Sequence, residues 1–248
     1  MADAERRTNS LSLFISLIDR PATALAEVAA HPKWRWLLPT ILLVGAMVAS
    51  IVLTSPLTTD QAQRTMQQQV AALPAGTAEM ARAQIDRLQQ PGFVLAMAIA
   101  GGLLGLALAW LLASAILYFS MVISGADLHF SALFATLPWV WLPFALRDVV
   151  QTGWILFRNR LIANPGLSYL VSSGKPLEDA TNLLYGVLSY VDLFVLWHLV
   201  LVFVLARTLP RFSGGKAFMV TLIYAAISLG LRLLPVILGG SLLGTVLG

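Results

Sequence analysis

The stretch from Phe93 to Ile123 contains no charged residue and consists mostly of apolar side chains. A helix needs about 20 such residues, at ~1.5 Å each, to cross the ~30 Å hydrocarbon core of a bilayer. The whole chain has the same bias: 58% of its 248 residues are hydrophobic and only 11% are charged. Soluble domains carry about 25% charged residues. The sequence therefore predicts an all-α integral membrane protein, with the lipid bilayer as its solvent.

Further apolar segments of sufficient length predict a bundle of about five transmembrane helices. The second segment is too long to cross the membrane upright, so we expect it to tilt. The third contains Pro138 and Pro143, which lack a backbone N–H and should kink the helix. The predicted spans cover about residues 36–54, 93–123, 131–157, 182–206 and 217–238.

Residues 1–35 form a predicted cytoplasmic segment ahead of the membrane domain, which covers residues 36–248. Apolar residues recur at helical spacing from Ser10 to Ala30, and Pro21 marks the start of a second helix. These two amphipathic helices either lie against the membrane surface or pack on the protein's own cytoplasmic face. The sequence leaves both alternatives open.

A long polar segment, residues 55–91, separates the first two spans. Its apolar residues recur at helical spacing on both sides of Pro74-Ala75-Gly76, which predicts a helical hairpin outside the membrane that packs on the spans beneath it; a mobile helical loop is the alternative. Basic residues concentrate in the cytoplasmic segments of membrane proteins. Five of them directly precede the first span, namely Arg6, Arg7, Arg20, Lys33 and Arg35. We therefore expect a cytoplasmic N-terminus and an extracytoplasmic hairpin.

Few residues offer catalytic or metal-binding chemistry. The chain has no cysteine, and its three histidines, His31, His129 and His198, are isolated in the sequence. It lacks the phosphate-binding GxxxxGK[ST] loop and the GxSxG nucleophile motif. No segment combines a basic patch with aromatic residues, so nucleic acid is not an expected partner. We expect no enzymatic activity, no cofactor and no metal.

Small residues recur every four positions along the second span, at Gly101, Gly105, Ala109 and Ala113. Helices in lipid associate through close backbone approach, which small side chains permit. The spacing predicts a helix-packing seam; a pore or substrate groove lined by glycine is the alternative.

Ionisable residues at membrane depth are costly unless they pair or face a polar interior. Asp192 lies near the middle of the fourth predicted span and Arg232 within the fifth, while Arg147 and Asp148 lie in the third. We hypothesise that these four residues form a buried charge cluster. The cluster either locks helix register or serves as a proton or ion relay or a substrate site. Alternatively, Arg147 and Asp148 simply reach the membrane interface.

Several motifs resemble the prokaryotic form of the YIP (Ypt/Rab-interacting protein) family. The likeness is most specific at the fourth span, in Val191-Asp192-Leu193-Phe194-Val195-Leu196-Trp197, and in the basic loop that ends in Gly214-Gly215-Lys216-Ala217. The turn Ser124-Gly125-Ala126-Asp127-Leu128-His129-Phe130 and the pair Leu137-Pro138 form a second group. Arg20-Pro21-Ala22-Thr23-Ala24 and His31-Pro32-Lys33-Trp34 form a third. The motif positions are Gly125, Pro138, Asp192 and Trp197, and the likeness covers about residues 10–235.

The resemblance implies a compact five-helix bundle in the inner membrane of a bacterium, with its N-terminus in the cytoplasm. Eukaryotic members of the family associate with Rab-type GTPases in vesicle traffic, and some prokaryotic relatives accompany ABC-type exporters. The short N-terminus and the long 55–91 segment differ from the eukaryotic pattern.

We therefore expect a non-enzymatic membrane scaffold or accessory subunit that binds another membrane protein or a second copy of itself. The alternative is a small transporter or channel that uses the charged cluster around Asp192. A third hypothesis is bilayer shaping by the Ser10–Ala30 helices and the 55–91 hairpin.

Overall fold

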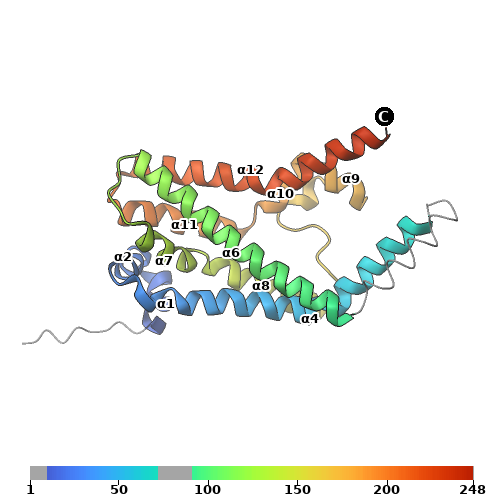
Figure 1. The fold of residues 1–248 in the computed structure, drawn as a ribbon, viewed down its shortest axis with the longest axis horizontal. Helices are drawn as coiled ribbons and strands as arrows, with labels where there is room; N and C mark the ends of the chain where they lie inside the picture. Colours follow the sequence, from blue (N-terminus) through green and yellow to red (C-terminus); the bar gives the residue numbers. More distant parts are fainter. Residues whose placement is uncertain (1–9, 72–90, 248) are drawn as a thin grey trace, which may run out of the picture. The chain divides into compact units, whose positions relative to one another are not determined.

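The structure is a computed structural model that describes residues 10–71 and 91–247, and every regular element in these ranges is helical (Figure 1). The elements are α1 (Ser10–Asp19), α2 (Pro21–Ala30), α3 (Pro32–Arg35), α4 (Leu37–Ala71), α6 (Pro91–Ile123), α7 (Phe130–Val140), α8 (Leu142–Arg158), η1 (Ser168–Leu170), α9 (Pro176–Thr181), α10 (Leu183–Tyr190), α11 (Leu193–Thr208) and α12 (Gly214–Leu247).

Within the described ranges, four helical segments are long and apolar enough to cross a membrane. They are Pro32–Gln67, Gly92–Ile123, Phe130–Arg158 and Gly214–Ile237. A fifth is obtained if α10 and α11, which are bent by 67° relative to each other, form one broken span. The all-α class and the abundance of membrane-length helices thus agree with the sequence.

The chain divides into two compact units, which we describe separately. The first comprises Met1–Leu43, Ala109–Phe144 and Asn164–Gly248, and the second comprises Val44–Leu108 and Ala145–Ala163.

Helix α7 lies in the core of the first unit. Its residues from Ala135 to Val140 are all buried, and it contacts α2, α3 and α11. Trp139 is fully buried, and its indole N–H donates to the carbonyl oxygen of Arg35 at 3.0 Å. This bond ties the start of the first apolar helix to α7.

The N-terminal helices begin and end as the sequence predicts, with a new helix at Pro21. Helix α2 buries Ala24, Leu25 and Val28 and contacts α7 and α11, so it packs on the protein itself. Helix α1 buries Leu13 and Leu17 but leaves the side chains of other apolar residues exposed. Ile15 and Ile18 are 64% and 65% exposed.

Pro138 and Pro56 lie inside helices, and at both a neighbouring side chain compensates for the missing N–H. Pro138 leaves the carbonyl of Phe134 without its helical donor, and the indole N–H of Trp110 donates to it at 3.1 Å. Pro56 likewise leaves the carbonyl of Val52 without its helical donor, and this carbonyl accepts a hydrogen bond from the Ser55 hydroxyl at 3.0 Å. Such compensation allows proline within membrane helices.

The helix that contains the first predicted span extends beyond the predicted limit at residue 54. Residues 55–71 are the direct continuation of α4, whereas a separate hairpin was expected to begin at residue 55. Because Ser55 replaces the hydrogen bond that Pro56 removes, the helix does not end at the proline. The rest of the predicted hairpin, residues 72–90, lies outside the described residues.

The fourth predicted span also differs from expectation. Residues 182–206 do not form one helix, because α10 ends at Tyr190 and α11 begins at Leu193. The third span is interrupted at Trp141, between the two prolines that predicted a kink. Helix α12 continues to Leu247, beyond the predicted limit at residue 238.

Replacing Trp110 by phenylalanine tests the compensation at Pro138. The Trp110 ring stacks on Phe134, with centroids 4.5 Å apart. Phenylalanine keeps an aromatic ring at this position, but the carbonyl of Phe134 loses its hydrogen-bond donor. We expect Trp110→Phe to lower the free energy of unfolding in detergent by about 1–3 kcal/mol, the cost of an unsatisfied acceptor.

The matched control is Trp154→Phe, at a tryptophan that is 40% exposed. We expect it to change the unfolding free energy by less than about 0.5 kcal/mol. Equal losses for the two variants would contradict the role assigned to the Trp110 indole.

Candidate functional site

The break between α10 and α11 places Asp192 at the start of a helix. Asp192 has an extended backbone (φ −140°, ψ 171°), and its Oδ1 accepts a hydrogen bond from the backbone N–H of Val195 at 2.8 Å. This is the geometry of an N-cap, which satisfies one of the free N–H groups of the first turn. Asp192 therefore lies at the break between the two helices and caps the N-terminus of α11.

A loop from the preceding connection packs directly against this break. The N–H of Leu167 donates to the carbonyl of Leu188 at 2.9 Å. Gly166 has a positive φ of +58°, and a Cβ atom there would lie 2.7 Å from the carbonyl oxygen of Val191 and 2.8 Å from that of Leu188. Only glycine fits both the backbone conformation and this close approach.

The four residues of the hypothesised charge cluster belong to different units. In the first unit, the guanidinium carbon of Arg232 lies 4.9 Å from the centre of the Tyr190 ring, a cation–π distance. In the second, Arg147 Nε lies 3.9 Å from Asp148 Oδ1, and both side chains are partly exposed. A single cluster of Asp192, Arg232, Arg147 and Asp148 stays a prediction.

His198 joins three helices of the first unit in a polar contact that the sequence analysis did not foresee. It is 1% exposed; its Nδ1 lies 3.0 Å from the carbonyl oxygen of Val140 and its Nε2 lies 3.0 Å from the hydroxyl of Tyr224. Because a carbonyl only accepts, Nδ1 carries the proton, and Nε2 of the neutral ring accepts from the tyrosine.

His198 is therefore a histidine packed in the core of the first unit. Its partners lie far away in the sequence, on α7 and α12, and no local pattern pointed to them. The arrangement satisfies both ring nitrogens in an apolar core, as buried polar groups require.

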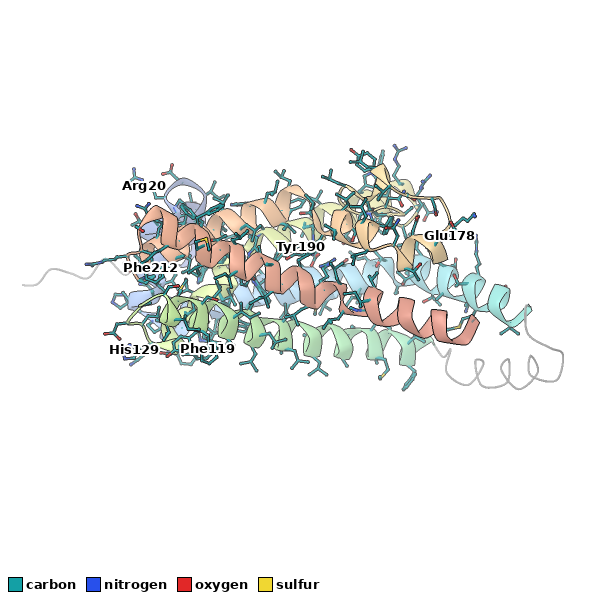
Figure 2. The ribbon with its side chains drawn as sticks, turned by 90° about the horizontal axis from the view of Figure 1, so that it is seen from above. Arg20, Phe119, His129, Glu178, Tyr190 and Phe212 are labelled. Atoms are coloured by element: carbon teal, nitrogen blue, oxygen red, sulfur yellow. The ribbon has the colours of Figure 1, made fainter. Side chains whose placement is uncertain are left out.

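Two of the motif groups meet at one end of the first unit. Gly125, with φ +91°, ends α6, and the N–H of Ala126 bonds to the carbonyl of Met121 at 2.9 Å, which is a Schellman cap. Lys216 Nζ donates to the carbonyl of Ser124 at 3.3 Å. Figure 2 shows Phe119, His129 and Phe212 at this end, whereas Glu178 lies at the other.

The remaining motif and seam positions have different environments. Pro138 is buried in α7, and Trp197 is half-buried on α11.

No described atom lies within 4 Å of a Cβ placed on Gly101 or Gly105 of the predicted seam, whereas a Cβ on Gly102 would contact Ile51 and Met47 at 3.2–3.3 Å. Ala109 is exposed and Ala113 is buried. Within the second unit, Gly102 is thus the glycine that packs against α4.

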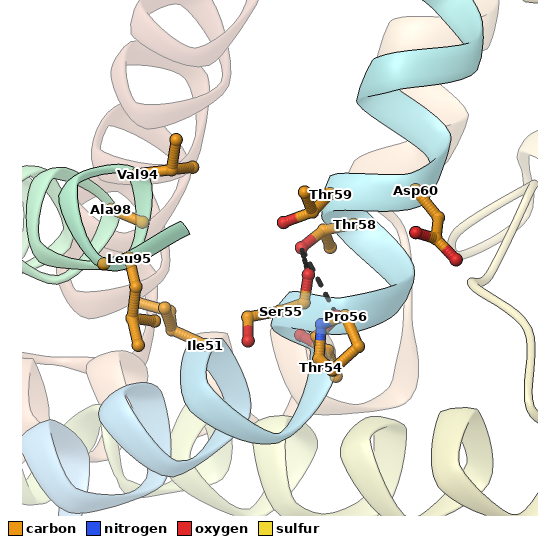
Figure 3. Close-up of a pocket in the computed structure, with 11 residues that line it drawn as sticks. Ile51, Thr54, Ser55, Pro56, Thr58, Thr59, Asp60, Val94, Leu95 and Ala98 are labelled. Carbon is orange, nitrogen blue, oxygen red and sulfur yellow. Dashed lines mark hydrogen bonds between the residues drawn. The ribbon is translucent and has the colours of Figure 1, made fainter. Parts of the chain in front are cut away.

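A cleft of about 590 Å³ lies between α4 and α6 in the second unit (Figure 3). Three of its hydroxyl groups are engaged locally, since Thr54 bonds to the carbonyl of Ser50, Ser55 to that of Val52 and Thr58 to that of Ser55. The walls contributed by α6 are apolar, with Val94, Leu95 and Ala98 facing the cleft. The cleft offers an apolar surface without a converging set of catalytic groups.

Outside the spans, Asp179 organises the loop ahead of α10. Its carboxylate accepts from the N–H of Ser173 and the hydroxyl of Ser172, each at 2.7 Å. These hydrogen bonds hold the pKa of Asp179 below its ordinary value of 3.8, so the carboxylate is ionised at neutral pH.

Alanine at Gly166 tests the contact between its loop and the helix break. Because Gly166→Ala adds a methyl group against carbonyl oxygens and strains the positive φ, we expect a loss of about 3 kcal/mol in unfolding free energy. Gly174→Ala is the control: its φ is +75°, but no described atom lies within 4 Å of the added group.

We expect the control to lose only about 1 kcal/mol, from backbone strain alone. Denaturant titration of the purified protein in detergent measures both values. A loss at Gly166 no larger than that at Gly174 would show that the loop does not pack on the break.

Comparison with known proteins gave no match of this chain to a protein-family model, to a curated protein or to a solved structure. The likeness to the YIP family accordingly stays a prediction that rests on the motifs.

Proposed function

We propose that this chain is a non-enzymatic multi-pass membrane scaffold or accessory subunit that binds another membrane protein, or a second copy of itself, through α6. The observation that carries the proposal is the uncovered surface of this helix. No residue from 92 to 112 is buried, although this part of the chain has the composition of a membrane span.

Gly101 and Gly105 give this surface a place for close helix packing. They lie four residues apart, on the same face of α6, and both are exposed with open space around them. In lipid, such small-residue faces let a second backbone approach closely. Ala109 extends the face, whereas Ala113 is already buried within the protein.

Family resemblance suggests the partners to test first. ABC-type exporters and vesicle-trafficking machinery are the candidates, in a bacterial inner membrane with the N-terminus in the cytoplasm. The basic residues ahead of the first span support this orientation.

Leucine on both glycines tests the proposed surface. Because neither position is packed inside the described protein, we expect Gly101→Leu/Gly105→Leu to fold normally and to weaken association by roughly tenfold or more through steric exclusion. Cross-linking in native membranes and copurification in mild detergent measure the association.

The matched control is Ala100→Leu/Ala107→Leu, which adds leucines to two exposed positions that lie about 100° or more around α6 from Gly101 and Gly105. We expect it to associate as the native chain does. If the native chain has no stoichiometric partner and does not self-associate, or if the two double variants behave alike, the proposal is wrong.

A second candidate function, a small transporter or channel, is favoured by the unwound position at Asp192. Broken helices near the membrane midplane are typical of transporter binding sites, and an ionisable group in a span is often functional. The bend of 67° between α10 and α11 supports this alternative.

Asp192→Asn separates charge from capping, because asparagine caps helices about as well as aspartate. If the alternative is right, the variant keeps its melting temperature in detergent but loses roughly tenfold or more of its proton or cation flux in liposomes. Asp192→Ala, which also removes the cap, serves as the destabilised reference. Native chain without flux, or Asp192→Asn with full flux, would exclude the alternative.

A further inference from the structure

We propose that the second unit binds the headgroup of a phospholipid, one that carries both a phosphate and a primary amine, in a small cavity beside α4. The cavity has a volume of about 290 Å³, at the lower end of the range for ligand pockets. It is lined by α4 and by the turn that follows α8.

Two arginines supply the anion-binding chemistry. Arg64 on α4 and Arg160 after α8 both line the cavity, and neither forms an ion pair within residues 10–71 and 91–247. Guanidinium groups bind phosphate through paired, charge-assisted hydrogen bonds. A phosphate between two arginines from separate segments would be held from two directions.

The backbone after α8 fixes the position of Arg160. Asn159 adopts a left-handed conformation with φ +50°, and the N–H of Arg160 bonds to the carbonyl of Ile155 at 3.3 Å. This is the pattern of a Schellman cap, which ends the helix in a defined turn. Arg160 is thereby directed to the cavity by local structure rather than by a long flexible loop.

A single carboxylate, Asp60, gives the cavity a mixed charge. Asp60 lines the same cavity as the arginines, and Figure 3 shows its carboxylate pointing away from α6. Two cations and one anion complement a headgroup in which a phosphate is joined to an ammonium group. A purely anionic headgroup would leave the carboxylate of Asp60 without a partner.

The depth of the cavity suits a lipid at the membrane boundary. Leu57 and Leu161 supply apolar wall, and the exposed apolar end of α8, where Phe157 is 85% exposed, directly precedes the basic residues. The change from apolar to charged residues along both α4 and α8 marks the level of headgroups. A soluble phosphate compound would use the arginines but not these apolar groups.

Native mass spectrometry of the detergent-purified protein tests the proposal, with palmitoyl-oleoyl phosphatidylethanolamine as the probe. We expect one lipid to bind to the native chain and Arg64→Gln/Arg160→Gln to weaken that binding by roughly tenfold or more. Arg158→Gln is the matched control, because Arg158 is exposed and adjacent but does not line the cavity. It should bind as the native chain does.

Two further comparisons identify the ligand class. The native chain should prefer phosphatidylethanolamine to phosphatidylglycerol, and Asp60→Asn should abolish this preference. Soluble phosphoethanolamine and inorganic phosphate, at the same concentration, should not displace the lipid. Equal binding by the native chain and the double arginine variant would overturn the proposal, as would displacement by either soluble compound. Preference for phosphatidylglycerol would overturn the assignment of the amine to Asp60.

Discussion

Every backbone N–H and C=O group inside a bilayer needs a partner from the protein itself, since hydrocarbon offers none. Several described helices meet this requirement at points where the sequence interrupts them. Trp110 donates to the carbonyl that Pro138 frees, Ser55 donates to the one that Pro56 frees, and Asp192 caps the helix that starts after the break. These side chains allow the helices to bend or restart without exposing unsatisfied groups to lipid.

Four buried hydroxyl groups follow the same rule, whereas that of Thr152 has no hydrogen-bond partner among the described residues. Those of Ser114, Thr136 and Thr221 in the first unit, and of Thr54 in the second, each donate to the carbonyl four residues earlier, which satisfies a polar group inside an apolar core. The imidazole of His198 is instead satisfied across three helices. The polar interior of the first unit is therefore made of local bonds plus a few long-range ones, and the long-range ones define how its helices pack.

Helices α6 and α7 show how differently two apolar segments are used. Residues 135–140 of α7 are buried in the first unit, whereas residues 92–112 of α6 have no buried member. Both are apolar, so hydropathy alone does not separate a helix that faces protein from one that faces lipid or a partner. This difference is the basis for assigning a binding role to α6 and a structural one to α7.

The sequence by itself determined the helical class, the membrane-length segments and the break at Pro21, because length, hydropathy and proline geometry are local properties. It did not reveal the break at Asp192, since apolar residues on both sides continue the pattern of a single span. Nor did it reveal the meeting of Lys216 with Ser124, of His198 with Tyr224, or of Arg64 with the turn at Arg160 in one cavity. The tertiary structure alone decided these, because they depend on which helix faces pack together, and that choice is made by many weak contacts between residues far apart in the chain.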